Sequence, residues 1–176
     1  MLESRGLIVG PWGRFEPKRA WAHAAPPGAW TRIIADAASG ATLGFAAWRR
    51  SGPGFLAGWF GERQIEVFES EDASFLLSLS RGFWRNWTVF DAEEQAIGAV
   101  FRGVRLQLRG EGFARLRQRR SPDPGGFVDR LNQTVARASR HDGSSWLVSF
   151  LDMPLSDPFA RMVVLAAVLS WAPEPD

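Results

Sequence analysis

Short stretches in which apolar and polar residues alternate occupy the middle of the chain, between residues 31 and 116. The clearest covers residues 104–109, where Val, Leu and Leu alternate with Arg, Gln and Arg. Successive side chains of a β-strand point to opposite faces, so this period of two predicts a strand with one buried face. The stretches recur at intervals of about 8–12 residues, a spacing typical of a β-barrel or β-sandwich. The predicted strands are 32–36, 42–48, 65–69, 74–79, 86–91, 96–102, 104–109 and 146–151.

A helical spacing of apolar residues follows the Pro- and Gly-rich loop at 121–126. Such a spacing predicts an amphipathic helix that ends at about residue 139. The residues that would share its apolar face are Phe127, Val128, Leu131, Val135 and Ala138.

Residues 157–171 predict a second helix, apolar on every side beyond Arg161. Asp157 is a favourable N-cap, and Pro158 suits the first helical position. At 1.5 Å per residue this helix spans roughly 21 Å, short of the roughly 30 Å of a bilayer's hydrocarbon core. We therefore expect it to lie inside a closed sheet. The residues assigned to its core-forming surface are Phe159, Met162, Val163, Leu165, Ala166, Val168 and Leu169.

The length of the chain and the positions of its proline and glycine residues predict one main domain. Residues 1–30 are rich in Pro, Gly and Trp, so we expect an irregular segment packed on the domain formed by residues 31–176. Only Leu7, Ile8 and Val9 form an apolar run near the start, which is too short for the core of a signal peptide. We therefore expect a cytoplasmic protein, with peripheral contact at the inner face of the membrane if it binds lipid.

Two segments about 54 residues apart resemble each other, which suggests a duplicated hairpin unit. Asp36 and Asp91 each end a predicted strand, and Gly44 and Gly98 each follow the first aliphatic residue of the next one. An Asp at such a position caps a turn with its carboxylate, and a Gly permits a bulge or a close backbone approach. We therefore assign both aspartates to turn chemistry.

Composition removes several classes of chemistry. The chain has 176 residues with no cysteine and two histidines, which excludes disulfides, thiol catalysis and cysteine- or histidine-rich metal sites. No Gly-x-Ser-x-Gly elbow, P-loop or complete dinucleotide fingerprint occurs; the Gly110-Glu111-Gly112 segment lacks the third glycine. We therefore expect no enzyme activity, cofactor or metal.

Charge is unevenly distributed along the chain. The net charge is only +2, but residues 81–120 contain nine arginines and four acidic residues. Guanidinium groups on one strand face suit phosphate recognition, whether on a lipid headgroup or on nucleic acid. Nucleic acid is disfavoured because Phe113 is the one aromatic residue within the arginine run. The candidate anion-binding residues are Arg102, Arg105, Arg109, Arg115, Arg117, Arg119 and Arg120. Alternatively, these arginines pair with the acidic stretch 62–72 on a neighbouring strand.

The order of several segments resembles the tubby C-terminal-like superfamily, in its phospholipid scramblase and LURP-one-related branch. The segments that carry the resemblance are IEVFE at 65–69, FLLSLSR at 75–81, WTVFDA at 87–92, AIGAV at 96–100, and DPFARM at 157–162 running into the apolar helix. The resemblance implies a closed antiparallel barrel of about twelve strands around a central hydrophobic helix, and binding of anionic lipid headgroups. It does not extend to the cysteine cluster, the proline-rich tail or the acidic calcium segment of eukaryotic scramblases, of which only Asp152 and Asp157 remain. Calcium-triggered scrambling is therefore not expected.

Together these patterns predict a mainly β, single-domain barrel with a buried C-terminal helix. Its expected function is non-enzymatic binding of an anionic phospholipid or membrane surface through the arginine-rich face. The alternative is an intracellular scaffold domain that binds a protein partner and no lipid. A monomer is favoured in both cases.

Overall fold

The computed structural model describes residues 1–14, 24–25, 29–51, 62–82, 86–117, 125–151 and 157–171. Most of these residues form antiparallel strands, and one helix follows the last strand. The elements are β1 (Gly6–Val9), β2 (Gly13–Arg14), β3 (Trp30–Asp36), β4 (Thr42–Ser51), β5 (Glu62–Glu69), β6 (Phe75–Arg81), β7 (Asn86–Phe90), β8 (Ala96–Phe101), β9 (Arg105–Leu108), β10 (Glu111–Arg117), β11 (Gly125–Val128), β12 (Thr134–Arg140), β13 (Trp146–Phe150) and α2 (Pro158–Ser170).

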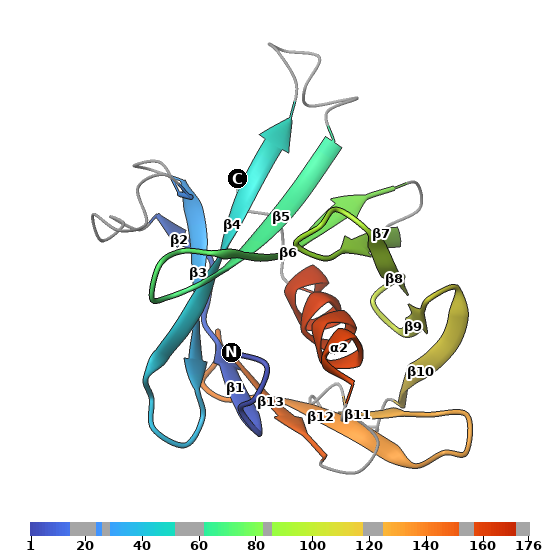
Figure 1. The fold of residues 1–176 in the computed structure, drawn as a ribbon. Helices are drawn as coiled ribbons and strands as arrows, with labels where there is room; N and C mark the ends of the chain where they lie inside the picture. The colour runs from blue at the N-terminus through green and yellow to red at the C-terminus, as the bar shows by residue number, and fades with distance from the viewer. Residues whose placement is uncertain are drawn as a thin grey trace.

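The strands form a barrel of consecutive hairpins that closes on itself (Figure 1). From β3 to β13 each strand pairs with the next one along the chain, and β1 then pairs with both β13 and β3. The result is a closed antiparallel barrel of 12 strands, with β2 added beside β3. The predicted fold class, a mainly β closed barrel with a C-terminal helix, is confirmed.

The closing strand lies in the segment that the sequence predicted to be irregular. Leu7 and Val9 are fully buried and face the core, whereas Gly6 and Ile8 are half-buried. Without β1, strands β3 and β13 would each present an unpaired edge. The prediction for residues 1–30 is therefore corrected at 6–9 and 13–14. The physical reason is that the four residues of β1 are too few to show a strand pattern in the sequence. Their strand conformation comes from pairing with β3 and β13.

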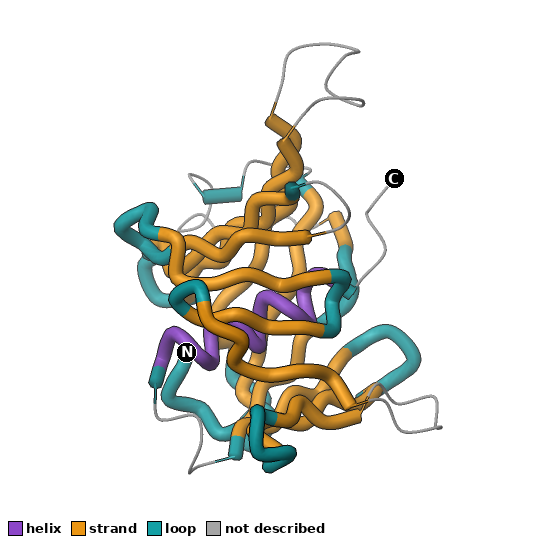
Figure 2. Tube along the Cα trace, turned by 90° about the vertical axis from the view of Figure 1, so that its right-hand side faces the viewer, coloured by secondary structure: helices purple, strands orange, loops and turns teal. Residues whose placement is uncertain are grey.

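The helix α2 occupies the interior of the barrel, as the tube drawing shows (Figure 2). Asp157 is its N-cap: the carboxylate accepts a hydrogen bond of 2.9 Å from the amide of Phe159, and Pro158 begins the helix. Contacts with β7, β8, β9 and β13 surround it. No helix among the described residues is long and apolar enough to cross a membrane.

Burial along α2 follows the expectation from its sequence. The helix has an unbroken buried run from Met162 to Leu169, and Ala160 is buried as well. Phe159 is half-buried at the N-terminal end. Among the residues assigned to the core, six are buried: Met162, Val163, Leu165, Ala166, Val168 and Leu169. A helix apolar on all sides is stable here because strands cover every side of it.

The predicted helix at 127–139 is wrong. Residues 125–128 form β11, residues 134–140 form β12, and a turn joins them. A register shift between Phe127 and Val128 accompanies the burial of both side chains. Two consecutive buried apolar residues break the alternation expected of a strand, so the sequence pattern resembles that of an amphipathic helix. Leu131, which the helix would have buried, lies in the turn with 76% of its surface exposed.

The turn chemistry predicted for the two repeated hairpins is present. The Asp36 carboxylate accepts hydrogen bonds from the amides of Ala38 and Ser39, and the Asp91 carboxylate accepts from those of Glu93 and Gln95. Each hairpin contains a register shift just before its turn. Both aspartates therefore stabilise bulged turns, as their sequence context predicted.

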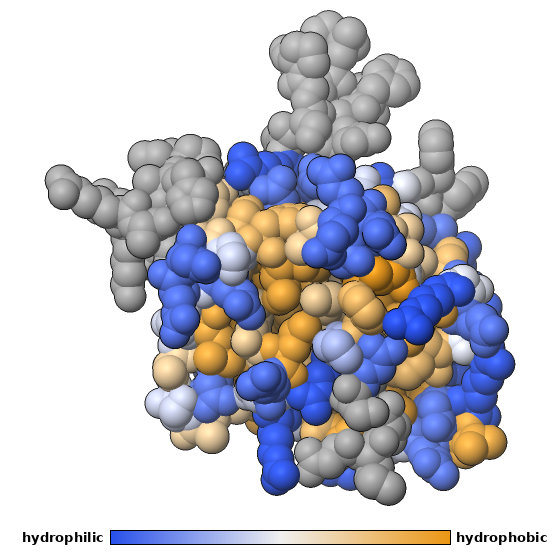
Figure 3. All heavy atoms as spheres, viewed as in Figure 1, coloured by the Kyte–Doolittle hydropathy of each residue, from blue (hydrophilic) through white to orange (hydrophobic). Residues whose placement is uncertain are grey.

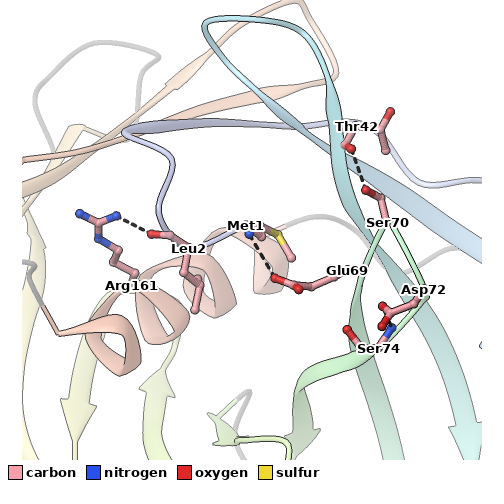
Figure 4. Close-up of polar contacts among 8 residues, drawn as sticks. All are labelled: Met1, Leu2, Thr42, Glu69, Ser70, Asp72, Ser74 and Arg161. Carbon is pink, nitrogen blue, oxygen red and sulfur yellow. Dashed lines mark hydrogen bonds and ion pairs between the residues drawn. The ribbon is translucent and has the colours of Figure 1, made fainter.

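At the end of the barrel that faces the viewer in Figure 1, the N-terminus is tied to the helix. The Met1 amine donates to the Glu69 carboxylate at 3.1 Å, and the Arg161 guanidinium donates to the carbonyl of Leu2 (Figure 4). The same guanidinium also donates to the carbonyl of Ser4. Drawn from the same side, Figure 3 shows apolar side chains in the middle of this end and polar ones around them. These contacts link the first residues of the chain to the start of α2.

Candidate anion-binding groove

Three of the predicted arginines lie on the outer face of adjacent strands. Arg105 of β9 is the direct cross-strand partner of Arg115 of β10, and Arg117 follows two residues later on the same face. Their chain neighbours Leu106 and Ala114 point the other way and are buried in the core. The alternation of side chains along a strand therefore separates the cations from the apolar residues, as the sequence pattern predicted.

A groove of about 1300 Å³ opens beside this pair of strands. It lies along β9 and β10 and reaches the turns before β9 and after β11. Between Gly112 and Ala114 the register of β10 shifts, and this bulge interrupts the wall of the barrel at the groove. The charged lining residues are Arg102, Arg105, Arg115, Arg130 and Asp129. The apolar lining residues are Phe101, Val104, Leu106, Phe113, Ala114 and Val128.

The basic groups of the groove are only partly neutralised. Arg115 donates to the Asn132 side chain at 2.9 Å, and Arg130 donates to the carbonyl of Gly112 at 2.8 Å. Within the described part of the chain, the side chains of Arg102 and Arg105 make no hydrogen bond or ion pair. Among the described lining residues, four cations and one carboxylate give the groove an excess positive charge.

Asp129, which lines the groove, and Glu111 do little to reduce its positive charge. The Asp129 carboxylate accepts hydrogen bonds from the amides of Leu131 and Gln133, at 2.8 and 2.9 Å. The ion pair between Arg130 and Glu111 joins two exposed side chains at 3.4 Å. Exposed pairs of this kind contribute about 0–1 kcal/mol. Arg105 and Arg115, by contrast, are like charges in direct cross-strand register, which is unfavourable until an anion lies between them.

Within the described part of the chain, the alternative that these arginines pair with the acidic stretch 62–72 on a neighbouring strand does not hold for Arg105 and Arg115. That stretch belongs to β5 and the turn after it, and strands β6, β7 and β8 lie between β5 and β9. Glu66 instead pairs with Arg49 at 2.5 Å, and Glu69 pairs with the Met1 amine. The acidic and basic stretches are therefore separate features of the surface.

The other predicted arginines do not join the groove in the described structure. Arg109 lies in the turn between β9 and β10, 3.9 Å from the Asp157 carboxylate and over the Phe159 ring. It therefore sits at the start of α2, away from Arg105 and Arg115. Arg117 is exposed on β10 but does not line the groove. Arg119 and Arg120 lie outside the described residues.

Comparison with protein-family models, curated proteins and solved structures finds no match.

Two residues of the site were missed from the sequence, namely Arg130 and Asn132. Both lie in the turn between β11 and β12, within the segment for which the sequence predicts a helix. A usable signal was present: Asp129 and Gln133 have the same spacing as Asp91 and Gln95 in the turn that was recognised. In both turns the amide of the glutamine donates to the carboxylate of the aspartate.

Proposed function

We propose that this chain is a non-enzymatic binding domain whose groove binds the headgroups of anionic phospholipids at a membrane surface. The observation that carries the proposal is a groove lined by Arg102, Arg105, Arg115 and Arg130, with Asp129 as the one carboxylate among its described lining residues. The resemblance to the tubby-like superfamily and its scramblase-related branch supports the same ligand class. The barrel around a central helix that this resemblance implies is the fold of the chain.

The side chains present suit a phosphate group. A guanidinium group offers a planar fork of N–H donors that matches the oxygen geometry of phosphate. Arg105 and Arg115 lie side by side, so one phosphate between them would satisfy both forks and relieve their repulsion. The apolar floor, including Phe101 and Phe113, suits the glycerol and upper acyl region next to a headgroup.

The expected strength is moderate and depends on salt. Near an anionic membrane each basic residue contributes about 1 kcal/mol, so a net of three charges gives roughly 3 kcal/mol. That corresponds to a preference of roughly 100-fold for anionic over neutral vesicles. Because the side chains are exposed, screening over a Debye length of about 10 Å at 0.1 M salt weakens this preference.

Leu131 favours a membrane over a free phosphate compound. It is the large apolar residue most exposed among the described residues, and it directly follows Asp129 and Arg130, which line the groove. Burial of a leucine side chain contributes about 1.5–3 kcal/mol. A protruding leucine beside a cationic groove can enter the interfacial region of a bilayer while the arginines hold headgroups.

Co-sedimentation with vesicles tests the proposal. We expect binding to phosphatidylcholine vesicles that contain phosphatidylserine, little binding to phosphatidylcholine alone, and weaker binding as sodium chloride increases. The variant Arg105→Gln/Arg115→Gln should bind about 30-fold more weakly, from the loss of about 2 kcal/mol. Leu131→Ser should also weaken vesicle binding without weakening the binding of soluble glycerophosphoserine.

A control variant with the same loss of charge separates the groove from net charge. Arg109→Gln/Arg137→Gln removes two exposed arginines that do not line the groove. If both double variants lose affinity equally, binding depends on overall charge and the groove is not the site. Absence of binding to anionic vesicles even at low salt would refute the lipid proposal and favour the protein scaffold.

A further inference from the structure

A second cationic group lies inside the barrel, on β3. Arg32 shares its strand face with Ile34, a fully buried core residue, and only 3% of the surface of Arg32 is exposed. The guanidinium carbon of Arg32 lies 5.1 Å from the ring centre of Trp12. Trp12 in turn meets Trp48 edge-on at 5.6 Å. These three side chains form one cluster, in which Arg32 and Trp48 are buried and Trp12 is half-buried.

The cluster contains buried donors and no acceptor. Nε and Nη1 of Arg32 and the indole Nε1 atoms of Trp12 and Trp48 are buried without a hydrogen-bond partner among the described residues. Guanidinium and indole N–H groups only donate, so these side chains cannot satisfy one another. Buried polar groups in folded proteins almost always have a partner, and an exception of four donors in one cluster indicates an acceptor from outside it.

No ion pair between described residues balances the charge of Arg32. Burial, and then the nearby positive charge of Arg140, lowers the pKa of Arg32 to about 10. Arg32 therefore remains protonated at neutral pH. Arg140 itself lies 4.0 Å from the ring centre of Trp146 and donates to the carbonyl of Gly143. A water molecule could accept hydrogen bonds here but could not balance this charge, whereas an anion does both.

We propose that Arg32, Trp12 and Trp48 form an interior site for the anionic oxygen group of a small molecule, a carboxylate or a phosphate. The site is distinct from the groove, because Arg32, Trp12 and Trp48 are not among the residues that line the groove. Its three donor side chains and its aromatic walls select an acceptor with negative charge. The proposal does not depend on lipid binding by the groove.

Thermal unfolding in different salts tests this site. We compare sodium acetate and sodium phosphate with sodium chloride at equal ionic strength, and read unfolding by circular dichroism. A ligand that binds only the folded state should raise the Tm by roughly 5–10 °C at a hundredfold excess over its Kd. The same rise is expected in the background Arg105→Gln/Arg115→Gln, which excludes phosphate binding in the groove as its cause.

Matched variants decide the assignment. Arg32→Met should abolish the anion-dependent rise in Tm, while Arg137→Met, which removes an exposed arginine, should retain it. If Arg32→Met does not fold, NMR can report on the site in the natural chain through the indole N–H resonances of Trp12 and Trp48. These resonances are assigned with the variants Trp12→Phe and Trp48→Phe. We expect saturable downfield shifts of these two resonances with acetate or phosphate. Equal effects of chloride, or no saturable response to either oxygen anion, would overturn the proposal.

Discussion

A single added methyl group at Gly98 should reveal how closely α2 packs against the barrel wall. A Cβ atom on Gly98 of β8 would lie 2.5 Å from the carbonyl oxygen of Gln107 and 2.6 Å from Cγ2 of Val163. Contacts below 3.0 Å are essentially never made by real Cβ atoms, so one of the neighbours must move. The Gln107 oxygen belongs to the adjacent strand β9, and Val163 is fully buried in α2. Neither can move without disturbing the barrel.

Overpacking of this kind costs about 1–3 kcal/mol, and the double clash places Gly98→Ala near the upper end. The matched control is Gly112→Ala on β10, where a Cβ atom would meet nothing within 4 Å. A surface change without clashes stays within about 0.5 kcal/mol. Urea unfolding followed by tryptophan fluorescence measures both variants. For a chain of this length, a loss of 3 kcal/mol lowers the Tm by roughly 6–12 °C. Equal stability of the two variants would show that α2 does not pack against β8 as described.

Two further predictions concern the core and one exposed turn. Leu165→Asp places an unpaired charge at a fully buried position, so this variant should show no cooperative unfolding transition by circular dichroism. The control Leu131→Asp, in an exposed turn, should leave the Tm unchanged. A cooperative transition of Leu165→Asp at the Tm of the natural chain would contradict the burial of α2 inside the barrel. The pKa of Asp36 is lowered to about 2, first by the Ser4 hydroxyl and then by Ser39. Its contribution is therefore present above the ordinary pKa of about 4 and is lost as pH falls towards 2. The difference in the free energy of unfolding between the natural chain and Asp36→Asn should be constant near neutral pH and should shrink as the pH falls from about 4 to about 2. A difference that stays the same over this pH range would contradict the stabilising role of the Asp36 carboxylate.

The features that the sequence predicted correctly are those with a local cause. The alternation at 104–109 is a property of consecutive residues, and the observed strand Arg105–Leu108 follows it closely. The last helix was predictable for the same reason, because its N-cap, its first-turn proline and its apolar surface all lie within 157–171. An apolar surface on all sides then required a closed sheet around it.

The features that were missed depend on partners far along the chain. The strand Gly6–Val9 has too few residues for a local pattern, and its conformation comes from pairing with β13 and β3. The false helix at 127–139 arose because a register shift buries two consecutive residues, Phe127 and Val128. The arginines of the groove were predicted from their strand positions, but Arg130 joins them through the pairing of β10 with β11.

Headgroup binding in the groove along β9 and β10 is tested most directly by observing where a soluble headgroup binds. We would titrate the isotopically labelled protein with glycerophosphoserine and record the amide and the arginine Nε–H resonances by NMR. If the groove binds the headgroup, we expect saturable shifts of the Arg105 and Arg115 Nε–H signals and of amides along the groove, and no shift at Arg109 and Arg137. Shifts spread over all exposed arginines, or no saturable shift at Arg105 and Arg115, would contradict it.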